Sequence, residues 1–326
     1  MNRGLQLSVT AGLAVAVSIG APHAYAQAAA YPTKPIRMTV SSGAGGGLDF
    51  VARQVATPLT EALGQSVVVD NRAGASGSIA AELAAQAAPD GYTLMMLSAS
   101  LVVYGVVNKT RYDLFRDFDP ISQVAASPYI LTVHPALPVQ SVTDLIAHAK
   151  ANPGKLNFAS TGPASLAHLS GELFALTTGT KMVHVPYKGV GAALADMLSG
   201  QIQLSFLSGG SVYGQVRNKR LKALAIASTT RAKMAPELPT MVEAGVPGFV
   251  VTQWHGLLAP RGTPPAVIDR LHREIVKAVQ RPEVVSRLAL DGTEGIASSP
   301  KEFAIHLKTE RDQWAKVAKA ANIRAE

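Results

Sequence analysis

The sequence predicts an α/β fold of two similar lobes, each a mostly parallel sheet flanked by helices, with a ligand cleft at the hinge between them. Strand-like runs rich in Val, Ile and Leu alternate with helix-like runs along most of the chain, which is typical of parallel sheets. This alternation occurs in two series, over residues 36–97 and 156–227. Extended segments carry the chain from the first lobe to the second near Ser127 and back to the first lobe near Phe249. Two crossings are typical of a hinged protein.

The first series contains three strands and two helices. Apolar and polar residues alternate over 36–40, and residues 66–70 read SVVVD, a short buried run. The pattern also predicts a strand at 92–97 and helices at 48–59 and 78–88. A stretch of small residues follows each strand: Ser41 to Gly47, Arg72 to Gly77, and Ser98 to Ser100. Ligands of open α/β sheets bind at these carboxyl ends, so the stretches are candidate contacts.

The second series repeats this arrangement. An irregular connection at 113–120 and an extended strand at 130–133 precede it, together with a helix that Ser141 caps. Each strand of the series leads into a loop of small or polar residues and then, in most cases, a helix. We predict strands at 156–159, 183–185, 202–207 and 221–227, loops at 160–163, 186–189 and 208–211, and helices at 165–178 and 190–198, with a third helix after the last loop that ends near Asn218.

The last part of the chain returns to the first lobe. Residues 236–247 form a proline-punctuated link, and residues 249–258 read as an extended strand. Helices at 264–279 and after Pro282, a short strand at 292–297 and an amphipathic helix from Ser299 onward complete the pattern. We therefore assign residues 27–127 and 250–326 to the first lobe and residues 128–249 to the second.

The first residues have the pattern of a secretory signal peptide. Arg3 supplies a positive charge, residues 5–19 are apolar, and Ala24-Tyr25-Ala26 is an A-x-A cleavage site. We expect residues 1–26 to be removed after Ala26 and the mature chain to be exported. The sequence contains no Cys, which excludes disulfides and a lipid-bearing cysteine. The apolar run Leu94 to Val107 is too short to span a bilayer.

The charge of the chain does not indicate a nucleic-acid partner. The formal net charge is +8, but only 16% of the residues are charged, and the basic residues are dispersed. One cluster stands out, formed by Arg217, Lys219, Arg220 and Lys222. We interpret it as a solvated basic face.

The stretch Ser41 to Gly47 links a strand to a helix through a loop that is almost free of side chains. Such a loop admits a ligand close to the backbone, and the first N–H groups of the helix favour an anion. It matches neither G-x-G-x-x-G nor a P-loop, although Asp70 keeps a dinucleotide site open. Three interpretations remain: a carboxylate-binding loop, a nucleotide-phosphate loop, and a tight turn without a ligand.

Catalytic motifs are missing from the sequence. The chain has eight His residues but no H-E-x-x-H, no G-x-S-x-G and no thiol. We therefore expect a binding protein without a metal or cofactor. An exported enzyme that acts on a small carboxylate is the alternative.

Short motifs with a specific order and spacing resemble one known family. They are Tyr31-Pro32-Thr33-Lys34-Pro35-Ile36, Gly47-Leu48-Asp49 with Arg53, Val68-Val69-Asp70-Asn71-Arg72, Pro89-Asp90-Gly91-Tyr92-Thr93-Leu94, His184-Val185-Pro186-Tyr187-Lys188-Gly189, and Leu238-Pro239-Thr240 with Glu243-Ala244-Gly245. Over essentially the whole mature chain, the sequence is similar to solute-binding receptors of the tripartite tricarboxylate transporter system, the TctC or Bug family.

This resemblance implies a periplasmic binding protein fold, type II-like, that closes on a small carboxylate such as a di- or tricarboxylate or an aromatic acid. It also implies delivery of the ligand to membrane permease subunits by a receptor that we expect to be monomeric. A receptor of another uptake system, of the ABC or TRAP type, is the alternative.

The candidate ligand contacts lie in two loops and a few flanking positions. The resemblance places the ligand at the loop before Asp49, favours the loop 160–165 as the opposing side, and places an aromatic residue, here Tyr31, near the cleft. The candidates are Tyr31, Gly43, Ala44, Gly45, Gly46, Asp49, Ser98, Ser160, Thr161, Gly162, Ser165, Tyr187 and Ser208.

Several candidates have structural alternatives. Asp49 has the position of a first-turn helix acid, Ser165 that of an N-cap, and Lys188 that of a structural residue near the hinge. We expect His168 to be a packed histidine and Arg72 to pair with Asp70. The family commonly has an acid where this chain has Leu207, so a contact there is in doubt.

Overall fold

The computed structural model describes residues 31–290 and 292–323. The chain divides into two units, residues 1–31 and 32–326, and the second contains all the elements described below. The predicted signal peptide lies outside the described residues. Among the described helices, none combines the length and apolar character that a membrane crossing requires.

Within the described residues, ten strands form one sheet with the main order β2-β1-β3-β9-β4-β7-β5-β6. Strands β1, β2 and β3 are parallel at one end, and β5, β6 and β7 are parallel at the other. The strands are β1 Ile36–Val40, β2 Val67–Asn71, β3 Thr93–Ser98, β4 Phe118–Val133, β5 Asn157–Ser160, β6 Val183–Pro186, β7 Leu204–Ser208, β8 Lys222–Ile226, β9 Thr252–Pro260 and β10 Glu294–Gly295.

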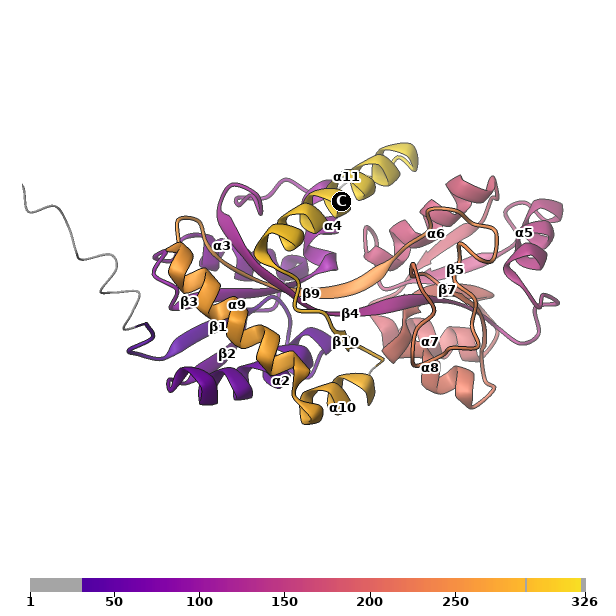
Figure 1. The fold of residues 1–326 in the computed structure, drawn as a ribbon. Helices are drawn as coiled ribbons and strands as arrows, with labels where there is room; N and C mark the ends of the chain where they lie inside the picture. Colours follow the sequence, from indigo (N-terminus) through magenta and orange to yellow (C-terminus); the bar gives the residue numbers. More distant parts are fainter. Residues whose placement is uncertain (1–30, 291, 324–326) are drawn as a thin grey trace, which may run out of the picture. The chain divides into compact units, whose positions relative to one another are not determined.

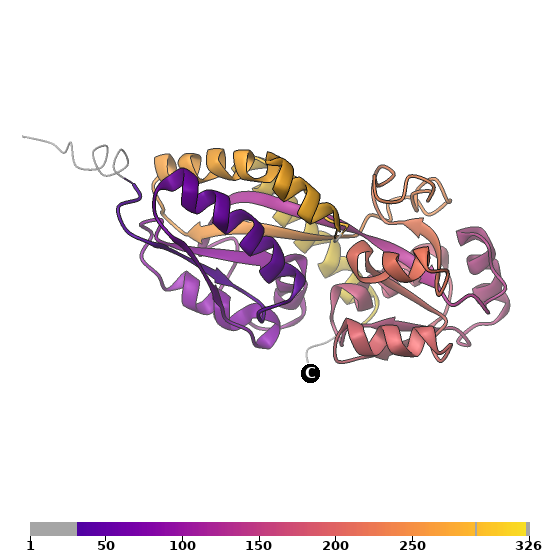
Figure 2. The same ribbon diagram turned by 90° about the horizontal axis from the view of Figure 1, so that it is seen from below.

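The long strand β4 joins the two halves of this sheet (Figures 1 and 2). Its first part pairs antiparallel with β9, from Phe118 opposite Pro260 to Pro128 opposite Thr252. Its last part, from Tyr129 onward, pairs antiparallel with β7 on one edge, and residues from Ile130 onward pair with β8 on the other. The halves are therefore connected by continuous β-structure, which confirms the predicted two-lobe α/β fold.

Helices pack on both faces of each half. In the first half, α2 packs against α9 and α10 on one face of the sheet, and α4 packs against α11 on the other face. In the second half, α6 packs on β5 and β7 and also contacts α11. The helices are α2 Gly47–Leu63, α3 Ser78–Ala85, α4 Ala99–Val107, α5 Val142–Ala151, α6 Leu166–Thr178, α7 Val190–Leu198, α8 Gly209–Arg217, α9 Pro265–Gln280, α10 Pro282–Leu290 and α11 Pro300–Ala320. A short 3₁₀ turn, η1 Ala75–Gly77, precedes α3.

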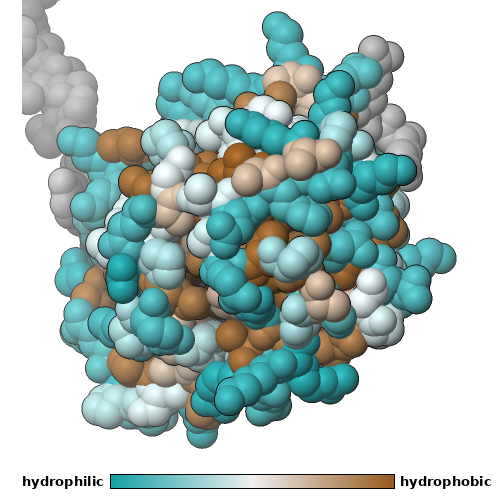
Figure 3. All heavy atoms as spheres, turned by 90° about the vertical axis from the view of Figure 1, so that its right-hand side faces the viewer, coloured by the Kyte–Doolittle hydropathy of each residue, from teal (hydrophilic) through white to brown (hydrophobic). Residues whose placement is uncertain are grey.

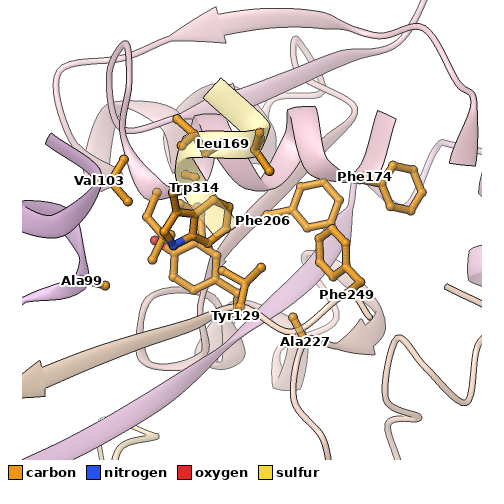
Figure 4. Close-up of a cluster of buried hydrophobic side chains, with 14 of the residues drawn as sticks. Ala99, Val103, Tyr129, Leu169, Phe174, Phe206, Ala227, Phe249 and Trp314 are labelled. Atoms are coloured by element: carbon orange, nitrogen blue, oxygen red, sulfur yellow. The ribbon is translucent and has the colours of Figure 1, made fainter. Parts of the chain in front are cut away.

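The hydrophobic core continues across the junction of the halves (Figure 4). The rings of Phe174, Phe206 and Phe249 pack against one another, with centroids 5.4 Å, 5.3 Å and 6.1 Å apart. Nearby, both tryptophan indoles, Trp254 at 3.2 Å and Trp314 at 2.9 Å, donate hydrogen bonds to Glu310 Oε2. Helix α11 is thereby fixed to the crossing strand β9.

The outer end of the second half is mostly hydrophilic, with separate hydrophobic patches (Figure 3). In the basic cluster, Lys219 and Arg220 are exposed, as predicted for a solvated basic face. Lys222 instead donates a hydrogen bond to the Val139 carbonyl at 2.8 Å.

One helix was not predicted and one predicted loop is wrong. Residues 99–107 form helix α4, where the sequence pattern indicates only the small-residue stretch Ser98 to Ser100; the helix is apolar on nearly all sides and shows no amphipathic period in the sequence. Helix α8 begins at Gly209, so most of the predicted loop 208–211 is helical. In addition, the predicted strand at 130–133 is the end of the sixteen-residue strand β4, and the strand at 292–297 is reduced to Glu294–Gly295.

Candidate functional site

Two adjoining cavities lie between the halves. The first, of about 350 Å³, is lined by Gly47, Leu48, Ser100, Ser127, Tyr129, Thr161, Gly189, Val190, Leu207, Ser208, Gly210, Ser211, Gln253, His255 and Thr293. The second, of about 610 Å³, is lined by Ser41, Ser42, Ser76, Ser98, Ser100, Tyr104, Asn108, Thr161, Gly162, Pro163, Ala164 and Ser165. Because Ser100 and Thr161 line both, we treat them as one cleft with an inner and an outer part.

Five helices begin at this cleft: α2, α4, α6, α7 and α8. Four of them have an N-cap residue that makes no side-chain capping bond, namely Gly46, Ser98, Gly189 and Ser208. In α6, Ser165 Oγ accepts a hydrogen bond from the His168 N–H, which confirms the N-cap alternative for Ser165. Uncapped first turns present free N–H groups and the positive end of the helix dipole, a combination that favours an anion.

The described residues that line the cleft include no Asp, Glu, Lys or Arg. The titratable ones are Tyr104, Tyr129 and His255. Burial raises the pKa of Tyr129 and lowers the pKa of His255 to about 4, so both are neutral at pH 7. The cleft therefore offers an anion hydroxyls, an amide and backbone N–H groups, with no fixed negative charge to repel it.

On the first-half side, Asp49 holds the glycine loop. Its carboxylate accepts hydrogen bonds from the Gly45 N–H at 2.8 Å, Asn71 Nδ2 at 2.9 Å and Arg53 Nε at 3.0 Å. Burial alone would raise the pKa of Asp49, but these bonds outweigh it and the pKa is lowered. The ionised side chain thus bonds to its own loop, and Asp49 does not line the cleft.

On the second-half side, two neutral histidines support the loop 160–165. The rings of His168 and His184 stack with centroids 3.6 Å apart and an interplanar angle of 6°. His184 Nε2 lies 2.6 Å from Ser160 Oγ, and His168 Nδ1 accepts a hydrogen bond from the Ala164 N–H at 3.1 Å. Burial lowers the pKa of both histidines to about 4, and for His184 the neighbouring His168 lowers it further. His168 is therefore a packed histidine, as predicted.

The structure brings five of the predicted contacts into the cleft: Ser98, Thr161, Gly162, Ser165 and Ser208. Gly43 to Gly46 form the exposed part of the loop, and the next residues, Gly47 and Leu48, line the inner cavity. Ser160 is fully buried beneath its loop. Tyr31 is the first described residue and is not among the lining residues.

Tyr187 and Arg72 make hydrogen bonds or ion pairs inside their own half. The Tyr187 hydroxyl donates to Asp196 at 2.7 Å, and burial together with this bond raises the pKa of Tyr187 to about 12. Arg72 Nε lies 3.0 Å from Asp70, which confirms the predicted structural pair. Leu207 is buried on β7 and lines the inner cavity with its apolar side chain.

Sequence reasoning missed the floor of the inner cavity. Ser127 and Gln253 are directly opposed on β4 and β9, and His255 follows two residues along β9. The available signal was a polar residue at every second position of a crossing strand, with the apolar Trp254 between Gln253 and His255.

Comparison with known proteins identifies the family. A family model described as "Tripartite tricarboxylate transporter family receptor" (TctC) matches residues 51–323. BugT of Bordetella pertussis is 38% identical over 95% of this chain and 93% of its own. The structure of R. palustris Rpa4515 with adipate is 34% identical, with a TM-score of 0.78 over 90% of this chain and 99% of that one.

MatC from Rhodopseudomonas palustris, solved with bound malate, is 29% identical, with a TM-score of 0.74 over 88% of this chain and 99% of that one. The family is one of receptors and not of enzymes. The chain therefore belongs to the TctC/Bug family and is a periplasmic solute-binding receptor.

Proposed function

We propose that this receptor captures a small carboxylate, such as a di- or tricarboxylate or an aromatic acid, in the cleft between its halves. The observation that carries the proposal is the meeting of five helix N-termini, four without a side-chain cap, at a cleft whose described lining includes no charged side chain. A carboxylate that loses its water there gains N–H and O–H donors from both halves.

Capture follows from closure of the two halves about β4 and β9. We place the boundaries of the lobes at 127/128 and 249/250, close to where β4 changes its partner from β9 to β7 and β8. The glycine loop and the loop 160–165 approach the ligand from opposite lobes. A ligand that contacts both lobes stabilises the closed form by its extra contacts there.

The relatives support a carboxylate as the ligand. Adipate and malate, bound by Rpa4515 and MatC respectively, are both dicarboxylates of low mass. We propose that the present cleft takes ligands of the same chemistry, through Gly47, Ser98, Thr161, Gly162 and Ser208.

The proposed setting is the periplasm, reached after cleavage behind Ala26. There the closed receptor, a monomer, docks on the membrane permease subunits of a tripartite tricarboxylate transporter and releases its ligand. Radiolabelled uptake by cells that contain or lack this receptor tests the delivery step.

A binding screen tests the capture step. Residues 27–326 are titrated with adipate, malate, citrate, benzoate and nicotinate, with NAD and sugars as controls. A ligand at one hundred times its Kd should stabilise the fold by about 2.7 kcal/mol, which a thermal shift detects. A shift with NAD and with none of the carboxylates would overturn the proposal.

A matched pair of variants locates the site. Thr161→Val keeps the shape of a residue that lines both cavities but removes its hydroxyl, whereas Thr177→Val makes the same change at an exposed position near the other end of α6. We expect Thr161→Val to weaken the carboxylate about tenfold, as for one lost hydrogen bond to a charged group, and Thr177→Val to leave its Kd unchanged.

A further inference from the structure

The floor of the inner cavity contains a histidine. His255 lies on β9, between β3 and β4, with Ser98 opposite on one side and Ala125 on the other. Side chains alternate along a strand, so Gln253 and His255 face the cavity while Trp254 faces the core, where it packs on Phe303 with ring centroids 5.6 Å apart. The crossing strand therefore presents an imidazole to the ligand space.

The imidazole has no protein partner among the described residues. His255 is only 5% exposed, and its Nδ1 is buried without a hydrogen bond. Because Nδ1 is closed to solvent, a group that enters the cavity can bond to the imidazole only at its other nitrogen, Nε2.

The described residues place no charged side chain around His255, and the first turns of α2, α4, α7 and α8 face the same cavity. Helices α2, α4, α7 and α8 and strand β7 contribute only uncharged residues to this cavity, and β4 contributes Ser127 and the phenol of Tyr129. Among the described residues that line it, Tyr129 is the one other titratable residue, and its pKa is raised by burial. Burial is likewise what lowers the pKa of His255, so the empty receptor holds it neutral.

We propose that His255 takes up a proton when a dicarboxylate binds and pairs with the ligand carboxylate at the floor, so that His255 selects dicarboxylates over monocarboxylates. This inference rests on the proposed capture of carboxylates. The helix N-termini satisfy one carboxylate of the ligand. The second would otherwise be desolvated on a floor that carries no positive charge.

The physical basis is the mutual stabilisation of two buried charges. A carboxylate within a few ångströms of an imidazole favours the imidazolium and opposes the effect of burial. At a pH above the pKa of His255 in the free receptor, each unit by which the pKa in the complex exceeds the pH is about a factor of ten in affinity. A monocarboxylate places an apolar end on the floor and leaves His255 neutral.

Calorimetry measures this proton directly. Residues 27–326 are titrated at pH 6 in phosphate and in a buffer of high ionisation enthalpy, with adipate against hexanoate and malate against 3-hydroxybutyrate. These pairs share a chain and differ by one carboxylate. We expect uptake of about one proton per dicarboxylate and none per monocarboxylate.

Two variants assign the proton. His255→Gln keeps a polar side chain of similar length without a titratable ring, and His148→Gln makes the same change on α5, outside the cleft. We expect His255→Gln to abolish the uptake and to weaken the dicarboxylate about tenfold at pH 6, with the monocarboxylate changed less than about twofold. His148→Gln should behave as the wild type.

The outcomes separate this inference from the proposed function. Dicarboxylate binding without proton uptake, or uptake that persists in His255→Gln, overturns the role of His255 and leaves the receptor function intact. No binding by any carboxylate overturns both. Should His255→Gln fail to fold, the wild-type contrast between adipate and hexanoate still decides.

Discussion

The two loops that face each other across the cleft do the same task with opposite chemistry. The glycine loop of the first half is held by an ionised carboxylate, Asp49, with the half-exposed Arg53 as its partner. The loop 160–165 of the second half is held by two stacked neutral imidazoles and a buried hydroxyl, Ser160. The difference teaches that helix N-termini can be presented to a ligand by either a charged or a neutral support, and that the two supports fail under different conditions.

The largest expected effect is a loss of folding stability on acidification, to which the histidine support should contribute and the Asp49 support should not. The pKa of His168 and of His184 is about 4 in the folded protein against 6.5 in the unfolded chain, so only the unfolded chain takes up protons between these values. The contribution of these histidines to the free energy of unfolding is fully present above pH 6.5. It is lost as the pH drops towards 4, by on the order of 3 kcal/mol for His168 alone. Urea unfolding between pH 7 and 4 measures this loss.

Variants assign part of the loss to the second half, because His255 and His306 outside it also have a pKa lowered to about 4. His184→Phe should reduce the pH dependence, because it removes one of the shifted groups. Asp49→Asn should keep the slope, because the lowered pKa of Asp49 places its titration below 3.8. Equal slopes in wild type and His184→Phe would contradict this division.

A backbone contact behind the glycine loop should give the next largest effect. A Cβ at Gly77 would lie 2.7 Å from Ser41 Cβ and 2.8 Å from the Ser41 carbonyl oxygen, and Gly77 has a φ of 96°. We expect Gly77→Ala to cost about 3 kcal/mol through strain and overlap, and to weaken ligand binding because Ser41 lines the outer cavity. Chemical denaturation and calorimetry measure both.

Gly64→Ala is the control for Gly77→Ala. Gly64 has a similar positive φ, of 68°, but a Cβ there would meet nothing within 4 Å. It should cost about 1 kcal/mol and leave the Kd unchanged. Equal costs for the two alanines would show that the contact with Ser41 is unimportant.

Removal of the charged support should cost somewhat less. Asp49→Ala leaves the Gly45 N–H and the Asn71 amide without their acceptor, at a cost of about 2 kcal/mol. The loop then loses its shape, and carboxylate affinity should fall although Asp49 does not line the cleft. Asp49→Asn retains one acceptor, so its stability and its carboxylate affinity should both lie between those of the wild type and those of Asp49→Ala.

The smallest effect is expected at Tyr187. Its hydroxyl bonds to Asp196, a residue of its own half, so Tyr187→Phe should cost less than about 1 kcal/mol and change the Kd less than twofold. Calorimetry with adipate decides, since a large loss of affinity would place the hydroxyl on the ligand.

The fold was predictable from local patterns. Strand-helix units such as residues 36–59 and 183–198 show their periods in the sequence itself, and the loops between them mark the carboxyl ends of the strands. Helix α4 was missed because a helix that is apolar on nearly every side has no amphipathic period. Most of the cleft lining that loops contribute could also be predicted from the sequence, because these loops directly follow recognisable strands.

The floor was not predictable, because it depends on pairing between distant segments. Ser127 and Gln253 are neighbours only because β9 inserts between β3 and β4. No local pattern encodes this order. The two interpretations of Asp49 were also left open by the sequence, since a residue beside a binding loop can bond to the loop itself, as Asp49 does to the Gly45 N–H.

The place of β9 in the sheet has a consequence for how the chain folds. Its neighbours β3 and β4 end at Ser98 and Val133, yet the strand that joins them ends at Pro260. Until that strand is available to pair, β3 and β4 each expose an unpaired edge, which is a template for aggregation. Folding of the first half is therefore a late event of high contact order, which needs nearly four-fifths of the chain.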